Sequence, residues 1–135
     1  MKICIVTQQY RNIHSGIGLY ATNIIKYLSN LGHYITVICS PDCKIDKSKN
    51  VNFIRVKNHK LDPTPNRWVS FSYHVSKYLK NKNNFDIIHF SDAREALFIK
   101  NKNAKLIGNM NDFYTADAKI NPLYYCKNFP GKQGS

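Results

Sequence analysis

The run Ile3-Cys-Ile-Val-Thr7 and the tetrapeptide Ser15-Gly-Ile-Gly18 decide the fold of this chain. The first is an apolar run typical of a buried strand, and the second opens an amphipathic helix that we predict over residues 17–31. A strand, a glycine turn and a helix start form an anion site together. Free backbone N–H groups and the positive end of the helix dipole converge there, and a missing Cβ lets a phosphate come close. The sequence therefore predicts a domain that handles a phosphorylated ligand beside Gly16 and Gly18.

Length and composition narrow the class of protein. At 135 residues the chain has room for one domain with a core. No apolar run approaches the ~18–20 residues that span a membrane, and no signal peptide precedes the first strand, so we expect a cytoplasmic protein. The four cysteines include no Cys-x-x-Cys pair, which favours reduced thiols and no metal site.

The net charge of +12 has several explanations. Nucleic acid, an anionic membrane surface or an acidic substrate would each suit a basic protein. A solvated, lysine-rich surface also explains it, because lysines such as Lys77, Lys80 and Lys82 fall at the end of a predicted helix, where the dipole favours cations. We favour this last interpretation.

Hydrophobic periodicity predicts alternating strands and helices. Further strands are expected over Tyr34–Cys39, Val51–Val56, Asp86–Phe90 and Ala104–Asn109, and a helix from about Arg67 to Leu79. Residues 40–50 are a polar loop, and Asn58–Asn66 is irregular because it holds two prolines. Asp92 is expected to cap a further helix, with Glu95 completing a capping box.

This order predicts an α/β fold: a doubly wound, mostly parallel Rossmann-like sheet of about five or more strands, with helices on both faces. With the strand order 3-2-1-4-5, the topological switch lies between the first and fourth strands, and ligands bind beyond the carboxyl ends of such strands. Both the glycine turn and Ser91-Asp92 would open there. The link between the second and third strands lacks a clear crossover helix.

Gly16-Ile-Gly-Leu-Tyr-Ala21 also fits the G-x-G-x-x-A pattern of dinucleotide-binding domains. In that fold the glycines turn directly off the first strand, whereas residues 8–15 intervene here. An NAD-type dinucleotide-binding domain therefore remains an alternative, as does the simpler interpretation that the glycines only shape a turn.

The chain resembles the N-terminal domain of a GT-B fold glycosyltransferase of the retaining family 4, often called group 1. The matching pieces, in order, are Lys2–Gln8, Ser15–Gly18, Tyr20–Leu31, Leu31–Pro41, Phe85–Phe90 and Ala104–Asp112. The resemblance implies transfer of a sugar from a nucleotide diphosphate sugar to an acceptor with retention. It also implies that residues 1–135 are the acceptor-side domain alone. The C-terminal donor-binding domain, which carries an E-x7-E motif in this family, is then absent, and we expect no turnover by this chain by itself.

The resemblance also assigns roles to residues. It places the donor diphosphate at Gly16 and Gly18, and it aligns Asn111 with a histidine that contacts the donor sugar in the family. Asparagine can hydrogen-bond a sugar hydroxyl but cannot take a proton near pH 7, which puts a catalytic role for Asn111 in doubt. A plain turn at Asn111-Asp112 is the other interpretation.

Three polar residues are candidate acceptor contacts: Arg11 and His14 in the first loop, and Asp92 after the fourth strand. An exposed loop histidine and a helix N-cap are the simpler interpretations of His14 and Asp92. We expect no metal and no cofactor, since these enzymes need no metal in their usual mechanism.

The expected partners are a nucleotide sugar donor and a sugar or lipid-linked acceptor. The basic surface is compatible with peripheral contact at the inner membrane face. A basic nucleic-acid-binding module is the second hypothesis, but no helix-turn-helix, zinc-finger or RNA-recognition signature supports it and arginine is scarce. We therefore expect no nucleic acid partner.

Overall fold

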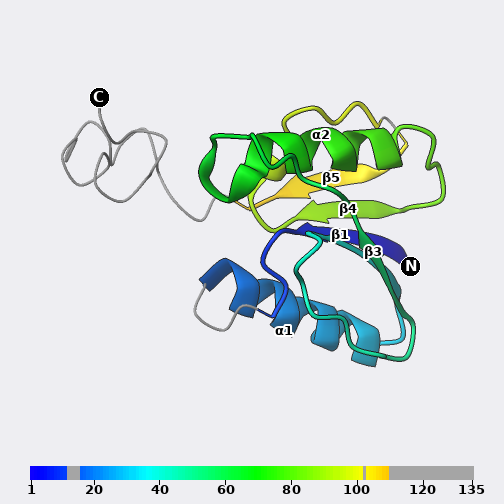
Figure 1. The fold of residues 1–135 in the computed structure, drawn as a ribbon. Helices are drawn as coiled ribbons and strands as arrows, with labels where there is room; N and C mark the ends of the chain where they lie inside the picture. Colours follow the sequence, from blue (N-terminus) through cyan, green and yellow to red (C-terminus); the bar gives the residue numbers. More distant parts are fainter. Residues whose placement is uncertain (12–15, 102, 110–135) are drawn as a thin grey trace, which may run out of the picture.

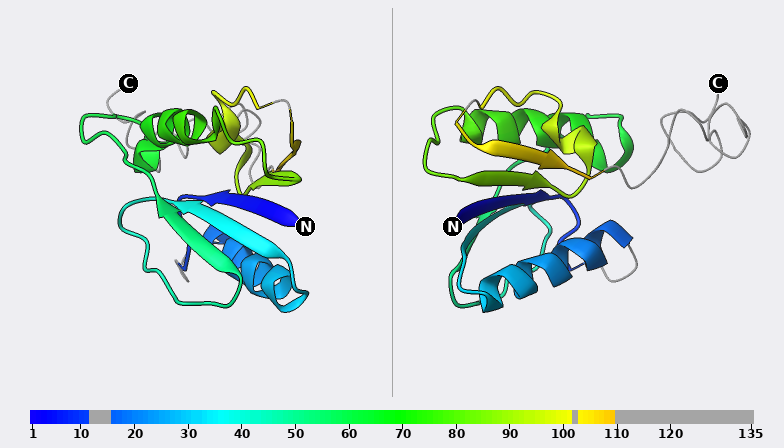
Figure 2. Two further views of the ribbon diagram at one scale, coloured as in Figure 1. Left: turned by 90° about the vertical axis from the view of Figure 1, so that its right-hand side faces the viewer. Right: turned by 180° about the vertical axis from the view of Figure 1, so that it is seen from behind.

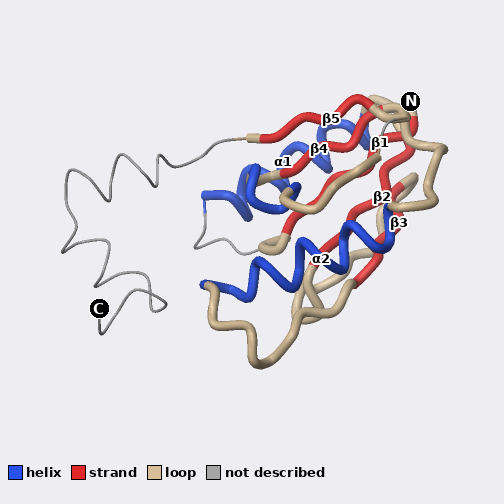
Figure 3. The backbone as a smooth tube through the Cα atoms, turned by 90° about the horizontal axis from the view of Figure 1, so that it is seen from above, coloured by secondary structure: helices blue, strands red, loops and turns tan. Residues whose placement is uncertain are grey.

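A five-stranded parallel sheet forms the centre of the computed structural model, which describes residues 1–11, 16–101 and 103–109 (Figure 1). The strands are β1 (Lys2–Thr7), β2 (Tyr34–Cys39), β3 (Val51–Arg55), β4 (Ile87–Phe90) and β5 (Lys105–Gly108). Their order is β3-β2-β1-β4-β5, and every neighbouring pair is parallel. Figure 3, seen from above, shows β4 and β5 on one side of β1 and the other two strands on the opposite side. The predicted fold class is confirmed, and the strand order is the one that places the topological switch between β1 and β4.

Helices cover both faces of this sheet. The helix α1 (Gly16–Asn30) lies on one face and α2 (Trp68–Leu79) on the other, as Figures 1 and 2 show. Alternate residues of β1 serve the two layers, because successive side chains of a strand point to opposite faces. Ile3 and Ile5 pack in the core with Ile25 of α1. Cys4 and Val6 pack on the other side with the α2 residues Phe71, Val75 and Leu79.

The apolar face of α1 is shorter than predicted. Ala21 and Ile25 are buried, but Leu31 is 57% exposed. The helix ends at Asn30, and Gly32 takes a positive φ of 89°, a conformation that glycine adopts without steric penalty. The turn that stops the helix therefore carries Leu31 away from the core.

The link between β2 and β3 crosses the sheet without a helix. It turns at Cys43, whose N–H donates to the Ser40 carbonyl at 3.2 Å. Further along, the Ser29 hydroxyl of α1 donates to the Lys49 carbonyl at 2.7 Å. The polar segment thus runs beside α1 in extended form, and it brings the chain back to start β3 parallel to β2.

The structure has two short 3-10 turns, one just before α2 and one just after β4. Pro65–Arg67 form a 3-10 turn at the entrance to α2. The capping box at Asp92 and Glu95 is present as predicted, but it opens only a 3-10 turn over Ala93–Ala96 rather than a helix. The N–H of Ala93 donates to the Asn109 carbonyl at 2.8 Å, which ties the start of this turn to the residue after β5.

No helix in the described part of the chain is long and apolar enough to cross a membrane.

Candidate functional site

The start of α1 lies over the junction of β1 and β4, which is the topological switch of the sheet. Tyr20, in the first turns of α1, lies with its hydroxyl 3.2 Å from Nε2 of His89 in β4. Burial lowers the pKa of His89, and a hydrogen bond with the Asn109 side chain opposes that shift. His89 is therefore a neutral, hydrogen-bonded core residue that fixes the head of α1 against β4.

The two glycines of the turn have different surroundings. Gly16 begins α1 and is exposed. Among the described residues, a Cβ added at Gly16 would meet no atom within 4 Å. Gly18 is buried, and its carbonyl accepts a hydrogen bond of 2.8 Å from the Thr22 hydroxyl. His14 falls in residues 12–15, outside the described residues.

Glu95, predicted from the sequence only as part of the capping box, connects the ends of the two strands that meet at the topological switch. Its Oε2 accepts the N–H of Gln8 at 2.9 Å, at the end of β1. Its Oε1 accepts the Ser91 hydroxyl and the Asp92 N–H, both at 2.8 Å, at the end of β4. The side chain is 2% exposed, and this burial raises its pKa to about 8 against the effect of the three donors. One carboxyl group therefore joins the loops that leave the two strands of the switch.

Asp92 is buried and engaged in local structure. Its Oδ1 accepts the Arg94 N–H at 2.9 Å. Its two oxygens also bind the Arg94 guanidinium, with Nε–Oδ1 at 3.1 Å and Nη2–Oδ2 at 3.0 Å. Its position at the switch agrees with the prediction, and in the described structure its carboxylate caps the turn after β4.

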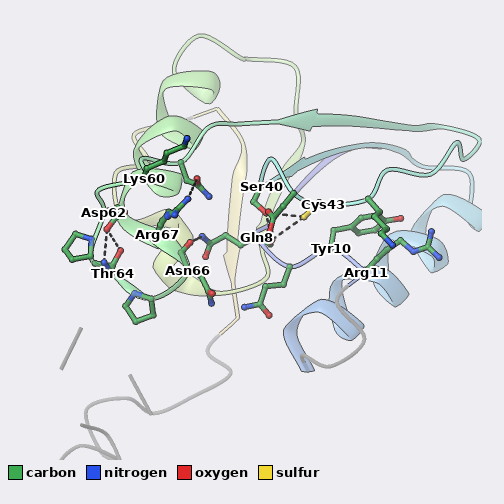
Figure 4. A pocket seen from close by; sticks show the side chains of 16 residues that line it. Gln8, Tyr10, Arg11, Ser40, Cys43, Lys60, Asp62, Thr64, Asn66 and Arg67 are labelled. Atoms are coloured by element: carbon green, nitrogen blue, oxygen red, sulfur yellow. Dashed lines mark hydrogen bonds between the residues drawn. The ribbon is translucent and has the colours of Figure 1, made fainter. Parts of the chain in front are cut away.

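A cleft of about 1070 Å³ opens at the carboxyl ends of β1, β2 and β3 (Figure 4). Three segments line it: Gln8–Arg11 after β1, residues 40 and 42–44 after β2, and residues 58, 60 and 62–67 between β3 and α2. The candidate Arg11 lies on its rim, where the guanidinium pairs with Asp46. Asp92 is not among the lining residues. The structure therefore separates these two candidate acceptor contacts.

The carboxylates that line the cleft are used by the protein itself. Asp62 accepts the N–H groups of Thr64 at 2.9 Å and Ser70 at 2.7 Å. Burial raises the pKa of Asp62, but these hydrogen bonds outweigh it and hold the pKa at about 2. Asp42 accepts the Ser40 hydroxyl at 2.7 Å.

A pair of thiols lies at the end of β2, with Cys39 its last residue and Cys43 in the loop that lines the cleft. Cys43 is 6% exposed and Cys39 is fully buried, in the same apolar cluster. A hydrogen bond from the Cys39 thiol lowers the pKa of Cys43, and the same contact raises the pKa of Cys39. Cys4, Cys39 and Cys43 are free thiols in the described chain.

Sequence reasoning missed the roles of Glu95 and of the segment before α2. A sole glutamate placed three residues after an N-cap is typical of a surface capping box, and nothing in its local sequence indicates that Gln8 would add a third donor. Prolines at 63 and 65 predicted an irregular segment. They did not predict the left-handed backbone of Asn66 and Arg67, with φ of 55° and 54°.

Within residues 1–11, 16–101 and 103–109, no group of three or more His, Cys, Asp or Glu side chains is placed to hold a metal ion. Asn111, the candidate aligned with the family histidine, lies outside the described residues.

The architecture is that of a Rossmann-like half of a GT-B enzyme. Sucrose-phosphate synthase from Thermosynechococcus elongatus has a similar fold, with a TM-score of 0.65 and 13% sequence identity. The match covers 90% of this chain and 35% of that chain. At this identity the likeness shows the fold alone.

The sequence model of Glycosyltransferase Family 4 matches residues 14–124, and the chain belongs to that family. The predicted resemblance to an N-terminal GT-B domain of family 4 is thereby confirmed. A comparison with curated proteins gave no significant match.

Proposed function

We propose that this chain is the acceptor-side domain of a retaining glycosyltransferase that uses a nucleotide diphosphate sugar. The donor diphosphate approaches Gly16 and Gly18 at the head of α1, and the acceptor occupies the cleft after β1, β2 and β3. Membership of family 4 supports the reaction class. The space around Gly16 is the observation that carries the placement of the donor.

Packing among the described residues does not demand a glycine at position 16. A Cβ there meets no described atom within 4 Å. A glycine at the first position of a helix, with no described atom beside its Cβ position, suits close approach of an anion to the free N–H groups.

The substitution Gly16→Ala tests this placement in the native polypeptide. The fold has room for the methyl group, so the free energy of unfolding stays the same or rises slightly, because alanine favours helix. The methyl group would stand where the diphosphate approaches. Loss of one hydrogen bond to a charged group is worth about 1.5–3 kcal/mol, which predicts a fall of roughly 10–100-fold in kcat/KM for the donor.

Release of nucleoside diphosphate in the presence of acceptor measures the reaction, and NMR of the product reports whether the anomeric configuration is retained. A Gly16→Ala enzyme with unchanged kcat/KM and unchanged stability would show that the glycine only begins the helix. An inverted product would contradict the retaining mechanism.

The acceptor side has a matched pair of variants. Arg11→Gln removes the guanidinium at the cleft rim, and we expect it to raise the acceptor KM while the donor KM holds. Asp46→Asn removes only the ion-pair partner of Arg11 and keeps the cation. Equal effects of the two variants would mean that the ion pair, rather than a contact between Arg11 and the acceptor, matters.

Residues 1–135 alone are expected to bind acceptor without transferring sugar, because family members carry donor recognition on a second domain. We expect neither a metal nor a cofactor to be required and no nucleic acid partner. Steep salt-dependent affinity for DNA or RNA would favour the nucleic-acid-binding alternative.

A further inference from the structure

One wall of the cleft carries cations that no acidic side chain among the described residues pairs with. We propose that Lys60 and Arg67, on the segment between β3 and α2, bind a phosphate group carried by the acceptor. This inference rests on the proposed function, since it names the chemical class of the molecule that the cleft accepts.

The acidic and basic side chains that line the cleft differ in how many contacts they make with the rest of the described chain. Its carboxylates, Asp42 and Asp62, accept hydrogen bonds from neighbouring residues. The ion pairs of the described chain join Arg11 to Asp46 and Arg94 to Asp92, and neither involves Lys60 or Arg67. Within the described residues, the Arg67 guanidinium makes a single, long hydrogen bond, 3.5 Å from Nη1 to Oδ1 of Asn58.

Lys60 and Arg67 belong to the same side of the cleft, opposite Arg11, as Figure 4 shows. A guanidinium presents a planar fork of donors and an ammonium adds a compact charge, and together they suit a dianionic phosphate better than a single carboxylate. The first N–H groups of α2 do not compete for this anion. Asp62 already accepts the N–H of Ser70 at 2.7 Å, and the Thr64 hydroxyl accepts that of Val69 at 3.3 Å.

The backbone that presents Arg67 is held in a costly conformation. Asn66 and Arg67 both have positive φ, at 55° and 54°, which residues other than glycine rarely adopt. Three hydrogen bonds retain it: Gln8 Nε2 to the Asn66 carbonyl at 2.9 Å, the Arg67 N–H to the Thr64 carbonyl at 2.9 Å, and the Ser70 hydroxyl to the Arg67 carbonyl at 3.1 Å. Strain of this kind persists where the surrounding structure fixes it and is concentrated at ligand sites.

Two glycine substitutions separate the charge of Arg67 from its backbone. Arg67→Gly removes the cation and relieves the strained φ. Asn66→Gly relieves the same strain one residue earlier and keeps the cation. Because both place a glycine in the left-handed region, both proteins should fold, and their comparison isolates the guanidinium.

The probes are glucose 6-phosphate, glucose and inorganic phosphate, followed by amide chemical shifts of the chain in NMR titrations. We expect glucose 6-phosphate to bind at least tenfold more tightly than glucose and to shift the amides of the 58–67 segment. Arg67→Gly should weaken this affinity at least tenfold and Lys60→Gln severalfold. Asn66→Gly, at a residue that also lines the cleft, should weaken the affinity much less than Arg67→Gly does, and Lys26→Gln, which removes an exposed lysine of α1 outside the cleft, should stay within twofold of the parent.

Vesicles of phosphatidylcholine with and without phosphatidic acid distinguish a lipid headgroup from a soluble phosphate. Binding to the anionic vesicles that Arg67→Gly abolishes and Lys26→Gln preserves would support a lipid-linked source. If Arg67→Gly and Lys26→Gln lost affinity equally, for glucose 6-phosphate or for vesicles with phosphatidic acid, the binding would be due to the general basic charge. That result would overturn the proposal. An Arg67→Gly protein that binds glucose 6-phosphate and the anionic vesicles as tightly as the parent does would also overturn the proposal.

The two proposals fail in different ways. Transfer to a neutral acceptor, with no phosphate binding in the cleft, would remove the phosphate site and leave the transferase. Phosphate binding that depends on Arg67, in a native polypeptide that transfers no sugar, would leave the site and remove the transferase.

Discussion

Glu95→Gln should remove the pH dependence of stability that the buried carboxyl imposes. In the folded chain the pKa of Glu95 is about 8, against an ordinary value of 4.5, so the folded state binds its proton more tightly than the unfolded state does. The contribution is fully present below about pH 4.5 and is lost as the pH rises through about 8. A shift of this size is worth about 5 kcal/mol at about 1.36 kcal/mol for each pH unit.

Glutamine removes the titration at a constant cost. The N–H groups of Gln8 and Asp92 bind different oxygens of Glu95, and an amide offers only one acceptor oxygen. One buried N–H therefore loses its partner, which costs about 1–3 kcal/mol at every pH. The variant should be less stable than the parent at pH 5 and more stable at pH 8, and the two stability curves should cross in between.

Urea unfolding between pH 5 and 8.5 measures the effect, with the fluorescence of Trp68, the single tryptophan, as the signal. The lowered pKa of His89 gives an opposite dependence, since its contribution is lost as the pH falls below about 6.5. The His89 contribution is the same in the parent and in Glu95→Gln, so it cancels in the difference between their free energies of unfolding. Parallel stability curves for the parent and Glu95→Gln would refute the buried, protonated carboxyl.

Two further substitutions test the contacts that place the site, and both are measured by urea unfolding. Tyr20→Phe should cost about 1 kcal/mol, the value of one hydrogen bond, because it removes the hydroxyl from His89, whereas Tyr27→Phe at a side chain 64% exposed should change nothing; equal effects would contradict the bridge. Asp62→Ala should cost about 1–2 kcal/mol, as loss of a helix cap does. The parent should lose stability as the pH falls from about 3.8 towards 2, and a variant that keeps this acid-induced loss would show that another carboxylate causes it.

Sequence patterns predicted the centre of the sheet because β1 and β2 are nearly continuous apolar runs. Strands buried on both faces leave few alternatives for their ends, so β1 and β2 match the predicted bounds, and β3 and β5 are shorter by one to two residues. The order β3-β2-β1-β4-β5 then follows from right-handed crossovers. The glycine turn was equally visible, since glycines after a strand and before a helix form a local signal.

The cleft and the hydrogen bonds of Glu95 could not be predicted in the same way. Each depends on groups far apart in the chain: the donors of Glu95 come from Gln8 and from residues 91–92, and the cleft joins loops after three strands. The helix predicted after Asp92 shows the complementary error. Its capping signal is local and correct, but the element that follows is only a 3-10 turn over Ala93–Ala96.

The hydrogen bonds of Glu95 and most of the cleft surface belong to different loops, so the cleft lining can vary in sequence while the Glu95 contacts stay intact. Glu95 ties together the ends of β1 and β4, while much of the cleft surface comes from the connections after β2 and β3. Side chains of those two connections that line the cleft can therefore be exchanged without breaking the Glu95 hydrogen bonds. A library that randomises residues 44, 58, 60 and 63 of the cleft lining, and keeps the buried Cys43 and the hydrogen-bonded Asp62, should yield folded proteins with altered ligand preference.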